Sequence, residues 1–284
     1  MTVNISVATS GHNFRHFGKN CPMGSDTDLR DFWENRLDAD WTESGVGYHT
    51  LGRAFNTWMY RVRRAVFGRE VARLDLGPAP RVLDVGSGTG FYLQCWQDAG
   101  VERIVGCDLT VAAVGRLRRR FPDLEFVRVN AADVANEFEP FSFDAVSCMD
   151  VLFHITDDEQ YARAVGGVAE VLRPGGYFVL SENFLHRAEQ RSAHQVNRTA
   201  SAIHLILTDA GFDVVRRVPM LVLMNAQVDA PIAWRKVWGG ALRAMTATEP
   251  TGWLAGAALY PLDRGLTRWL PESPTTELMI CRRT

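Results

Sequence analysis

The sequence has no marked excess of charge and no long apolar run. Its 31 basic and 33 acidic side chains give a formal net charge of −2 over 284 residues, without the general basic surface that nucleic-acid-binding proteins use. No stretch approaches the roughly 18 uninterrupted apolar residues that a membrane span requires. The first 23 residues lack an apolar core. We therefore expect an N-terminal arm that is neither signal peptide nor anchor, and a cytoplasmic protein.

Paired cysteines, internal repeats and low-complexity tracts are also missing. The five cysteines form no Cys-x-x-Cys pair and no even framework, so we expect no zinc site and no disulfides. Three of them lie inside apolar runs that we predict as strands, which indicates buried, reduced thiols. Magnesium-dependent chemistry stays open, because its carboxylates need not be adjacent in the sequence.

A glycine-rich run after a short apolar strand is the most informative segment present. Residues 82–85 lead directly into Gly86, Gly88 and Gly90, and a helical pattern follows. Glycine lacks a Cβ and tolerates positive φ, so such a run brings backbone close to a ligand. About 20 residues later Asp108 ends the next apolar run, where a ribose is held in dinucleotide-type folds.

From about residue 81 short apolar runs alternate with helical patterns, which is typical of a parallel sheet built from βαβ units. We predict strands that begin at Val82, Ile104, Phe126, Phe143, Tyr177, Phe212 and Glu277. Before the fifth strand we predict a helix with Thr156 as N-cap and Glu159 completing a capping box. Pro174-Gly175-Gly176 should end that helix.

The register Asp84-x-Gly86-x-Gly88-x-Gly90, with the strands that follow it, resembles the class I S-adenosylmethionine (SAM)-dependent methyltransferases. The resemblance covers about residues 80–219 and the last strand. It implies an α/β fold with a seven-stranded, mostly parallel Rossmann-like sheet whose last strand is antiparallel. A nicotinamide-dependent oxidoreductase is the alternative for this pattern. Its loop requires Gly-x-Gly-x-x-Gly, whereas position 91 is Phe.

Two additions flank this predicted core. We assign residues 1–78 to an N-terminal arm and helical cap, residues 79–220 and 274–284 to the SAM-binding core, and residues 221–273 to a lid of several short helices inserted between the last two strands. The cap helix has an apolar face, from which Arg61, Arg63 and Arg64 should turn away. Every tryptophan except Trp96 lies in one of the additions, so we predict an aromatic lid over the substrate.

The resemblance also implies the contacts of SAM, whose product is S-adenosylhomocysteine. The glycines approach its methionine part and ribose, Asp84 holds its ammonium, and Asp108 accepts from both ribose hydroxyls. Asp133 receives the exocyclic amine of adenine, unless it is only a helix cap. The predicted cofactor-binding residues are Asp84, Gly86, Ser87, Gly88, Gly90, Asp108, Leu109, Ala132, Asp133 and Met149.

Methyl transfer needs proximity, alignment and, for a weak nucleophile, a base. Asp150 and His154 follow the fourth strand and are the first catalytic candidates, although in this family such a histidine is often structural. His49, His194 and Glu182 are further candidates. The sequence lacks the Asn/Asp-Pro-Pro-Tyr motif of amino-methylating DNA enzymes.

We therefore predict methyl transfer to a small organic acceptor, at oxygen before nitrogen or carbon, in secondary metabolism or in modifying a glycan or lipid intermediate. One alternative is a SAM-binding protein that transfers no methyl group, either cyclase-type or regulatory. In another, the insertion is a contact surface for a protein or a membrane, which exposed Trp253 and Trp269 would support. The sequence does not decide the oligomeric state.

Overall fold

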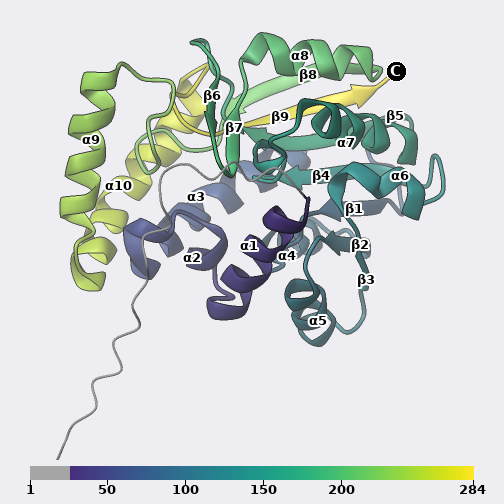
Figure 1. Cartoon of the computed structure of the whole chain (residues 1–284), viewed down its shortest axis with the longest axis horizontal. Coiled ribbons are helices and arrows are strands. Elements are labelled where there is room, and N and C mark those ends of the chain that lie inside the picture. The colour runs from purple at the N-terminus through teal and green to yellow at the C-terminus, as the bar shows by residue number, and fades with distance from the viewer. Residues whose placement is uncertain (1–25) are drawn as a thin grey trace, which may run out of the picture.

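A computed structural model describes residues 26–284. Its centre is a seven-stranded sheet in the order β3-β2-β1-β4-β5-β9-β8 (Figure 1). The first five strands in that order pair in parallel, and β9 is antiparallel to both β5 and β8. This topology confirms the predicted fold. The strands are β1 Arg81–Val85, β2 Arg103–Asp108, β3 Glu125–Arg128, β4 Phe143–Met149, β5 Leu172–Glu182, β8 Phe212–Pro219 and β9 Glu277–Arg283.

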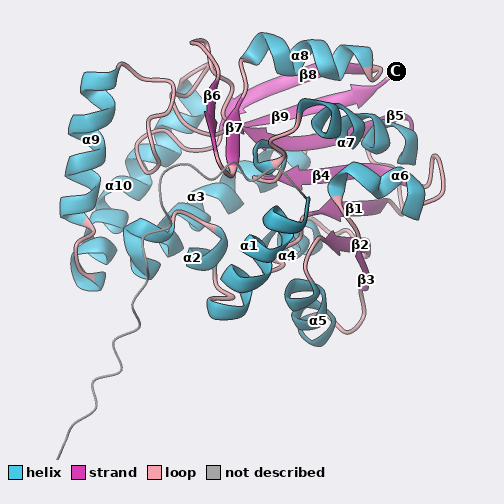
Figure 2. Ribbon diagram, in the orientation of Figure 1, coloured by secondary structure: helices cyan, strands magenta, loops and turns pink. Residues whose placement is uncertain are grey.

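Helices cover both faces of the sheet (Figure 2). Successive side chains of a strand point to opposite faces, so Val82 joins one core cluster while Leu83 and Val85 join the other. The first cluster also contains apolar side chains of α3, α4 and α5, and the second those of α7 and α8. These helices and the short α6 are α3 Gly52–Val71, α4 Phe91–Asp98, α5 Val111–Arg120, α6 Val134–Glu137, α7 Asp158–Val171 and α8 Ala200–Asp209.

Two predicted boundaries are wrong. The N-cap of α7 is Asp157, whose carboxylate accepts from the Gln160 N–H at 2.8 Å, rather than Thr156. A carboxylate caps a helix at least as well as a hydroxyl. Strand β5 begins at Leu172 rather than Tyr177, because Leu172 pairs with Phe143 across a register irregularity. Gly175, with φ of 76°, therefore lies inside the strand rather than in a turn before it.

The N-terminal cap lies against the glycine loop and the start of α5. It contains α1 Asp26–Ala39, α2 Glu43–Val46 and the 3₁₀ turn η1 His49–Leu51. The Glu34 carboxylate accepts from the N–H groups of Val111 and Ala112 at 2.8 and 2.7 Å. It thereby satisfies donors that the first turn of a helix leaves open. The Trp41 indole donates to the Gly88 carbonyl at 3.1 Å.

The insertion before β9 forms two helices, α9 Ile232–Met245 and α10 Glu249–Trp269, rather than several short ones. Pro261 lies inside α10 without ending it. α10 packs along α3, where Trp58 and Trp253 meet at 5.6 Å between ring centroids (Figure 1). Buried Asp263 of α10 accepts from the N–H groups of Val222 and Leu223, which fixes the start of the insertion. A small hairpin, β6 Gln190–Ser192 and β7 Gln195–Asn197, was not predicted.

The four cysteines within the described part of the chain are buried and free. Cys107, Cys148 and Cys281 lie in strands, as predicted. Cys21 and the predicted N-terminal arm, residues 1–23, lie outside the described residues. In residues 26–284 no helix is long and apolar enough to cross a membrane, and no group of three or more potential metal ligands is found there.

Candidate active site

The glycine loop joins β1 to α4 at the carboxyl edge of the sheet. Gly86, Gly88 and Gly90 have φ of 73°, 51° and 83°, a region that side chains rarely adopt. A Cβ at Gly86 would lie 2.3 Å from Val151, and one at Gly90 would lie 2.4 Å from Phe121. At Gly88 the nearest atom would be 3.4 Å away. Packing therefore requires the first and third glycines, whereas a Cβ at the second would make only ordinary van der Waals contact with Val46.

A first cavity of about 940 Å³ opens beside this loop. Residues from the ends of β1, β2, β3 and β4 form its core side, and α1 and α3 contribute Leu29, Trp33, Leu37 and Tyr60. The structure brings eight of the predicted site residues to it: Gly86, Ser87, Gly88, Asp108, Leu109, Met149, Asp150 and His154. Asp84, Gly90, Ala132 and Asp133 do not line it.

Asp108 ties the end of β2 to the glycine loop. Its Oδ2 accepts from the Gly88 N–H at 2.9 Å, and its Oδ1 accepts from the N–H and hydroxyl of Thr110 at 2.9 and 2.8 Å. Burial raises the pKa of this carboxyl above its ordinary value. A carboxylate has about four acceptor positions. Three are therefore used by the protein itself, which leaves one for a donor from the first cavity that Asp108 lines.

Asp84 lies behind the loop rather than in the cavity. It is 2% exposed, and its carboxylate accepts from the Ser147 hydroxyl at 2.5 Å. The Trp96 indole donates to the same hydroxyl at 2.9 Å. Burial raises the pKa of Asp84 to about 7. In this structure Asp84 joins β1, β4 and α4, and its contact with a SAM ammonium stays a prediction.

The segment after β3 differs in detail from the prediction. Asp133 is half-exposed, 3.4 Å from Arg163, and precedes α6 as its N-cap residue. Val129, Asn130 and Ala131 line the cavity instead. The Asn130 carboxamide oxygen accepts from the Ala132 N–H at 3.1 Å. Asn130 lies just after a strand end, where ligands bind in open α/β sheets.

A second cavity of about 1,270 Å³ adjoins the first. The two share Trp33, Val46, Tyr60, Asp150 and His154. The second is enclosed by the cap, α3, the β6–β7 hairpin and the start of the insertion. Residues of both additions therefore meet at the carboxyl edge of the sheet.

Arg63 of α3 and Asp150 form an ion pair at the junction of the cavities. Arg63 is 6% exposed and also donates to the Tyr92 hydroxyl at 3.3 Å. Asp150 has φ of 59° and holds the Ser181 hydroxyl at 2.9 Å. The prediction that Arg63 turns away from the protein is wrong. Its helix position borders the apolar face, and Asp150, which is 87 residues away, supplies the charge that makes burial tolerable.

His154 has a defined tautomer. Its Nδ1 lies 2.9 Å from the His194 carbonyl oxygen. A carbonyl only accepts, so Nδ1 carries the proton and Nε2 keeps a lone pair. Burial lowers the pKa of His154 to about 4, so the imidazole is neutral at pH 7. The Trp33 ring packs edge-on against it at 4.8 Å.

The other base candidates separate into two groups. His49 and His194 line the second cavity, and the His194 ring stacks on Phe32 at 5.5 Å. Glu182 lines neither cavity. It is buried 3.3 Å from the Tyr161 hydroxyl, and burial raises its pKa to about 8.

A chain of amides and hydroxyls lies along one side of the second cavity. The Asn225 amide donates to the Thr276 hydroxyl at 3.0 Å, which donates to the Asn183 carboxamide oxygen at 3.1 Å. Asn183 and Gln195 both donate to the Asn197 oxygen, at 2.9 and 2.7 Å. These polar residues were missed because they come from four separate segments.

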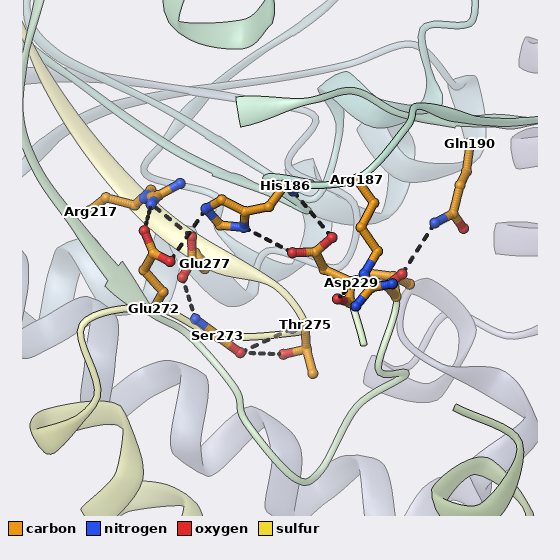
Figure 3. A network of polar contacts seen from close by, with 10 residues as sticks. His186, Arg187, Gln190, Arg217, Asp229, Glu272, Ser273, Thr275 and Glu277 are labelled. Carbon is orange, nitrogen blue, oxygen red and sulfur yellow. Dashed lines mark hydrogen bonds and ion pairs between the residues drawn. The ribbon is translucent and has the colours of Figure 1, made fainter. Parts of the chain in front are cut away.

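An ionic network lies next to these amides and hydroxyls and holds their segments in place (Figure 3). His186 lies 2.9 Å from Asp229 and 3.3 Å from Glu272. Arg217 pairs with Glu272 and lies 3.4 Å from Glu277. Asp229 follows Val228, and Glu277 follows Thr276, and both of those neighbours line the second cavity. The network therefore fixes the start of β9 and the loop before α9.

Glu277 should make stability depend on pH. Burial raises its pKa to about 7 from an ordinary 4.5. Below pH 4.5 such a carboxyl is protonated in both the folded and the unfolded state and does not affect stability. As pH rises toward 7, ionisation is more favourable in the unfolded state, so the folded protein is destabilised. As pH rises from 4.5 to 8, the free energy of unfolding of Glu277→Gln should therefore increase by about 1–3 kcal/mol relative to that of wild type. Urea unfolding across this range measures it, with half-exposed Glu272→Gln as control. Parallel curves for wild type and Glu277→Gln would contradict the assignment.

The fold and the cavity define a class of protein. Gly88, the Asp108 carboxylate and the apolar Leu109 and Val129 all line the first cavity, and they fit the ribose and adenine of a nucleoside cofactor. The methyltransferase domain family matches residues 83–180. Together with the order of the strands, this match identifies residues 83–180 as a class I methyltransferase domain, a class whose cofactor is SAM.

Curated proteins similar to part of this chain are methyltransferases. A ubiquinone biosynthesis O-methyltransferase of Paracidovorax citrulli is 31% identical over 137 residues, which is 46% of this chain and 50% of that protein. A demethylmenaquinone methyltransferase of Beutenbergia cavernae is 38% identical over 112 residues, 38% of this chain and 43% of that protein. The chain thus spans about half the length of the curated relatives it matches. The magnesium protoporphyrin IX methyltransferase of Synechocystis, solved with bound SAH, has a TM-score of 0.55 and 15% identity, covering 92% of this chain and 100% of that one.

Proposed function

We propose that the protein transfers the methyl group of SAM to an oxygen atom of a small organic acceptor bound in the second cavity. The observation that supports this proposal most directly is that the two cavities meet at Asp150 and His154. One cavity has the features of a SAM site, and the other is large enough for an acceptor and lies directly beside it. Such an arrangement places two reactants in contact without solvent between them.

We assign some of the lining residues to SAM binding and others to proton transfer. Asp108, Gly88 and Leu109 would hold the nucleoside part of SAM, and Met149 at the end of β4 would contact its methionine part. When bound, SAM supplies a methyl group already activated by its sulfonium. His154 Nε2 accepts the proton of the acceptor hydroxyl, because its tautomer leaves that nitrogen unprotonated. Arg63 fixes the Asp150 carboxylate at the junction.

The cavity lining supports a flat, oxygenated acceptor. Trp33, Tyr60 and Phe153 offer aromatic surface, and the amides of Asn183 and Asn225 offer donors for carbonyl or hydroxyl groups. Two curated relatives are named for ubiquinone and demethylmenaquinone methylation, which supports phenolic or quinol-like acceptors here.

Methyl transfer is tested with SAM labelled in its methyl group. The enzyme is incubated with phenols and catechols, and in parallel with amines and carbon acids. We expect label to enter the oxygen acceptors, with formation of equimolar S-adenosylhomocysteine. SAM binding without transfer to any acceptor would instead favour the cyclase-type or regulatory alternative. Titration with NAD tests the oxidoreductase alternative.

His154 should affect turnover and not cofactor affinity. His154→Gln removes the proton acceptor, so kcat should fall about 100-fold, within the range for general-base catalysis. The Kd for SAM should change less than about threefold, since the residues proposed to hold SAM are Asp108, Gly88 and Leu109. Because the pKa of His154 is about 4, protonation of this base should not lower the wild-type rate between pH 8 and pH 6. An equal loss of kcat in His49→Gln would assign the base to His49 instead.

A further inference from the structure

Helix α9 stands at the edge of the molecule, away from the sheet (Figure 1). Leu242 is its only buried residue within the described chain. Ile232, Trp234 and Val237 are 68%, 46% and 65% exposed. Exposed apolar side chains gathered on one element mark an interaction surface more often than scattered ones do.

The charge of α9 is entirely positive. Residues 230–248 contain no Asp or Glu, and they contain Arg235, Lys236 and Arg243. None of these three forms an ion pair with any side chain from residue 29 to residue 284. A helix that combines exposed Trp, Ile and Val with unpaired cations has the chemistry of one that lies in the headgroup region of a bilayer. The missing counter-charge is supplied by anionic lipid.

A groove of about 980 Å³ connects this helix to the second cavity. Ile232, Arg235, Lys236 and Arg243 line it on the α9 side. Tyr48, Asn225, Ala226 and Val228 line both the groove and the second cavity. The groove beside α9 and the second cavity are therefore neighbours that share one wall.

We propose that α9 docks the protein on an anionic phospholipid surface and that acceptors enter from this surface along the groove. The charge of α9 favours this partner over a second copy of the chain, because a symmetric contact through α9 would place its three cations against three like charges. The entry route rests on the proposed function. The docking itself does not, and it is measured without SAM or acceptor.

Co-sedimentation with vesicles tests the docking. Wild type should bind vesicles of phosphatidylcholine with phosphatidylglycerol at least tenfold more strongly than vesicles of phosphatidylcholine alone, with binding reduced by salt. Lys236→Glu with Arg243→Glu should weaken binding to the anionic vesicles at least tenfold, and Ile232→Ser with Val237→Ser about tenfold. Lys236 and Lys19 are the only lysines in the sequence. Anionic vesicles should therefore protect Lys236 from an amine-reactive acetylating reagent, as mass spectrometry reports.

Matched controls lie elsewhere on the surface. Leu205→Ser on α8 removes an equally exposed apolar residue, 61% exposed, and Arg119→Glu on α5 reverses an exposed charge. Both should bind vesicles as wild type does, and all variants should keep the SAM affinity of wild type by calorimetry. The proposal is overturned if wild type ignores anionic vesicles, or if the α9 variants bind them unchanged. It is also overturned if light scattering shows a dimer that only the α9 variants dissociate, since a second copy then covers the helix.

Discussion

Asp108→Ala is expected to weaken SAM binding about 100-fold. The carboxylate faces the first cavity, and a hydrogen bond from a ribose hydroxyl to an ionised acceptor contributes about 1.5–3 kcal/mol. The same substitution frees the Gly88 and Thr110 N–H groups that Asp108 now holds at 2.9 Å each, so the glycine loop also loses its fixed position. Together these losses amount to about 2.7 kcal/mol, which is about a hundredfold in Kd.

Asp133→Ala is the matched control for this measurement. The sequence predicted both aspartates as SAM ligands, but only Asp108 lines the cavity. Calorimetric titration should therefore show a change in Kd of less than about threefold for Asp133→Ala. Asp108→Asn keeps an oxygen for Thr110 and should give an intermediate loss. If the two alanine variants bind SAM equally well while remaining folded by circular dichroism, the assignment of Asp108 is wrong.

Arg63→Leu should destabilise the protein by about 2–4 kcal/mol and abolish most methyl transfer. The Arg63 and Asp150 side chains are 7% and 21% exposed, and removing one partner leaves the other charge poorly solvated. Asp150 lies where the two cavities meet, so its displacement misaligns both reactants. Urea unfolding gives the stability change, and labelled SAM gives the rate.

The neighbouring residue provides the control. Arg64 pairs with Asp98 on the surface, with side chains 43% and 48% exposed, so Arg64→Leu should cost less than about 1 kcal/mol. In a double-mutant cycle, Arg63→Leu with Asp150→Asn should cost clearly less than the sum of the single changes. Asparagine tolerates the positive φ of position 150, so strain does not obscure the coupling. Strict additivity would show that the two side chains act independently.

Local patterns in the sequence were sufficient for the sheet and the centre of the cofactor site. Gly86, Gly88 and Gly90 are recognisable because positive φ excludes other residues at successive positions. Asp108 is recognisable because it ends an apolar run at the expected spacing. Each of these signals depends on residues that are close in the sequence and on the local backbone geometry. The boundaries of β5 and α7 were less determined, since adjacent residues such as Thr156 and Asp157 are both able to cap a helix.

The sequence by itself thus determined the α/β sheet, the glycine loop and the acidic residue beside it. Only the tertiary structure decided that Asp84 lies behind the cavity, that Arg63 is buried, and that α1 covers the site. It alone joined Asn183 to Thr276, which are 93 residues apart. The physical reason is that a buried charge or a polar cavity wall depends on the partner that another segment supplies. That partner is absent from any local pattern, and folding alone brings it within hydrogen-bonding distance.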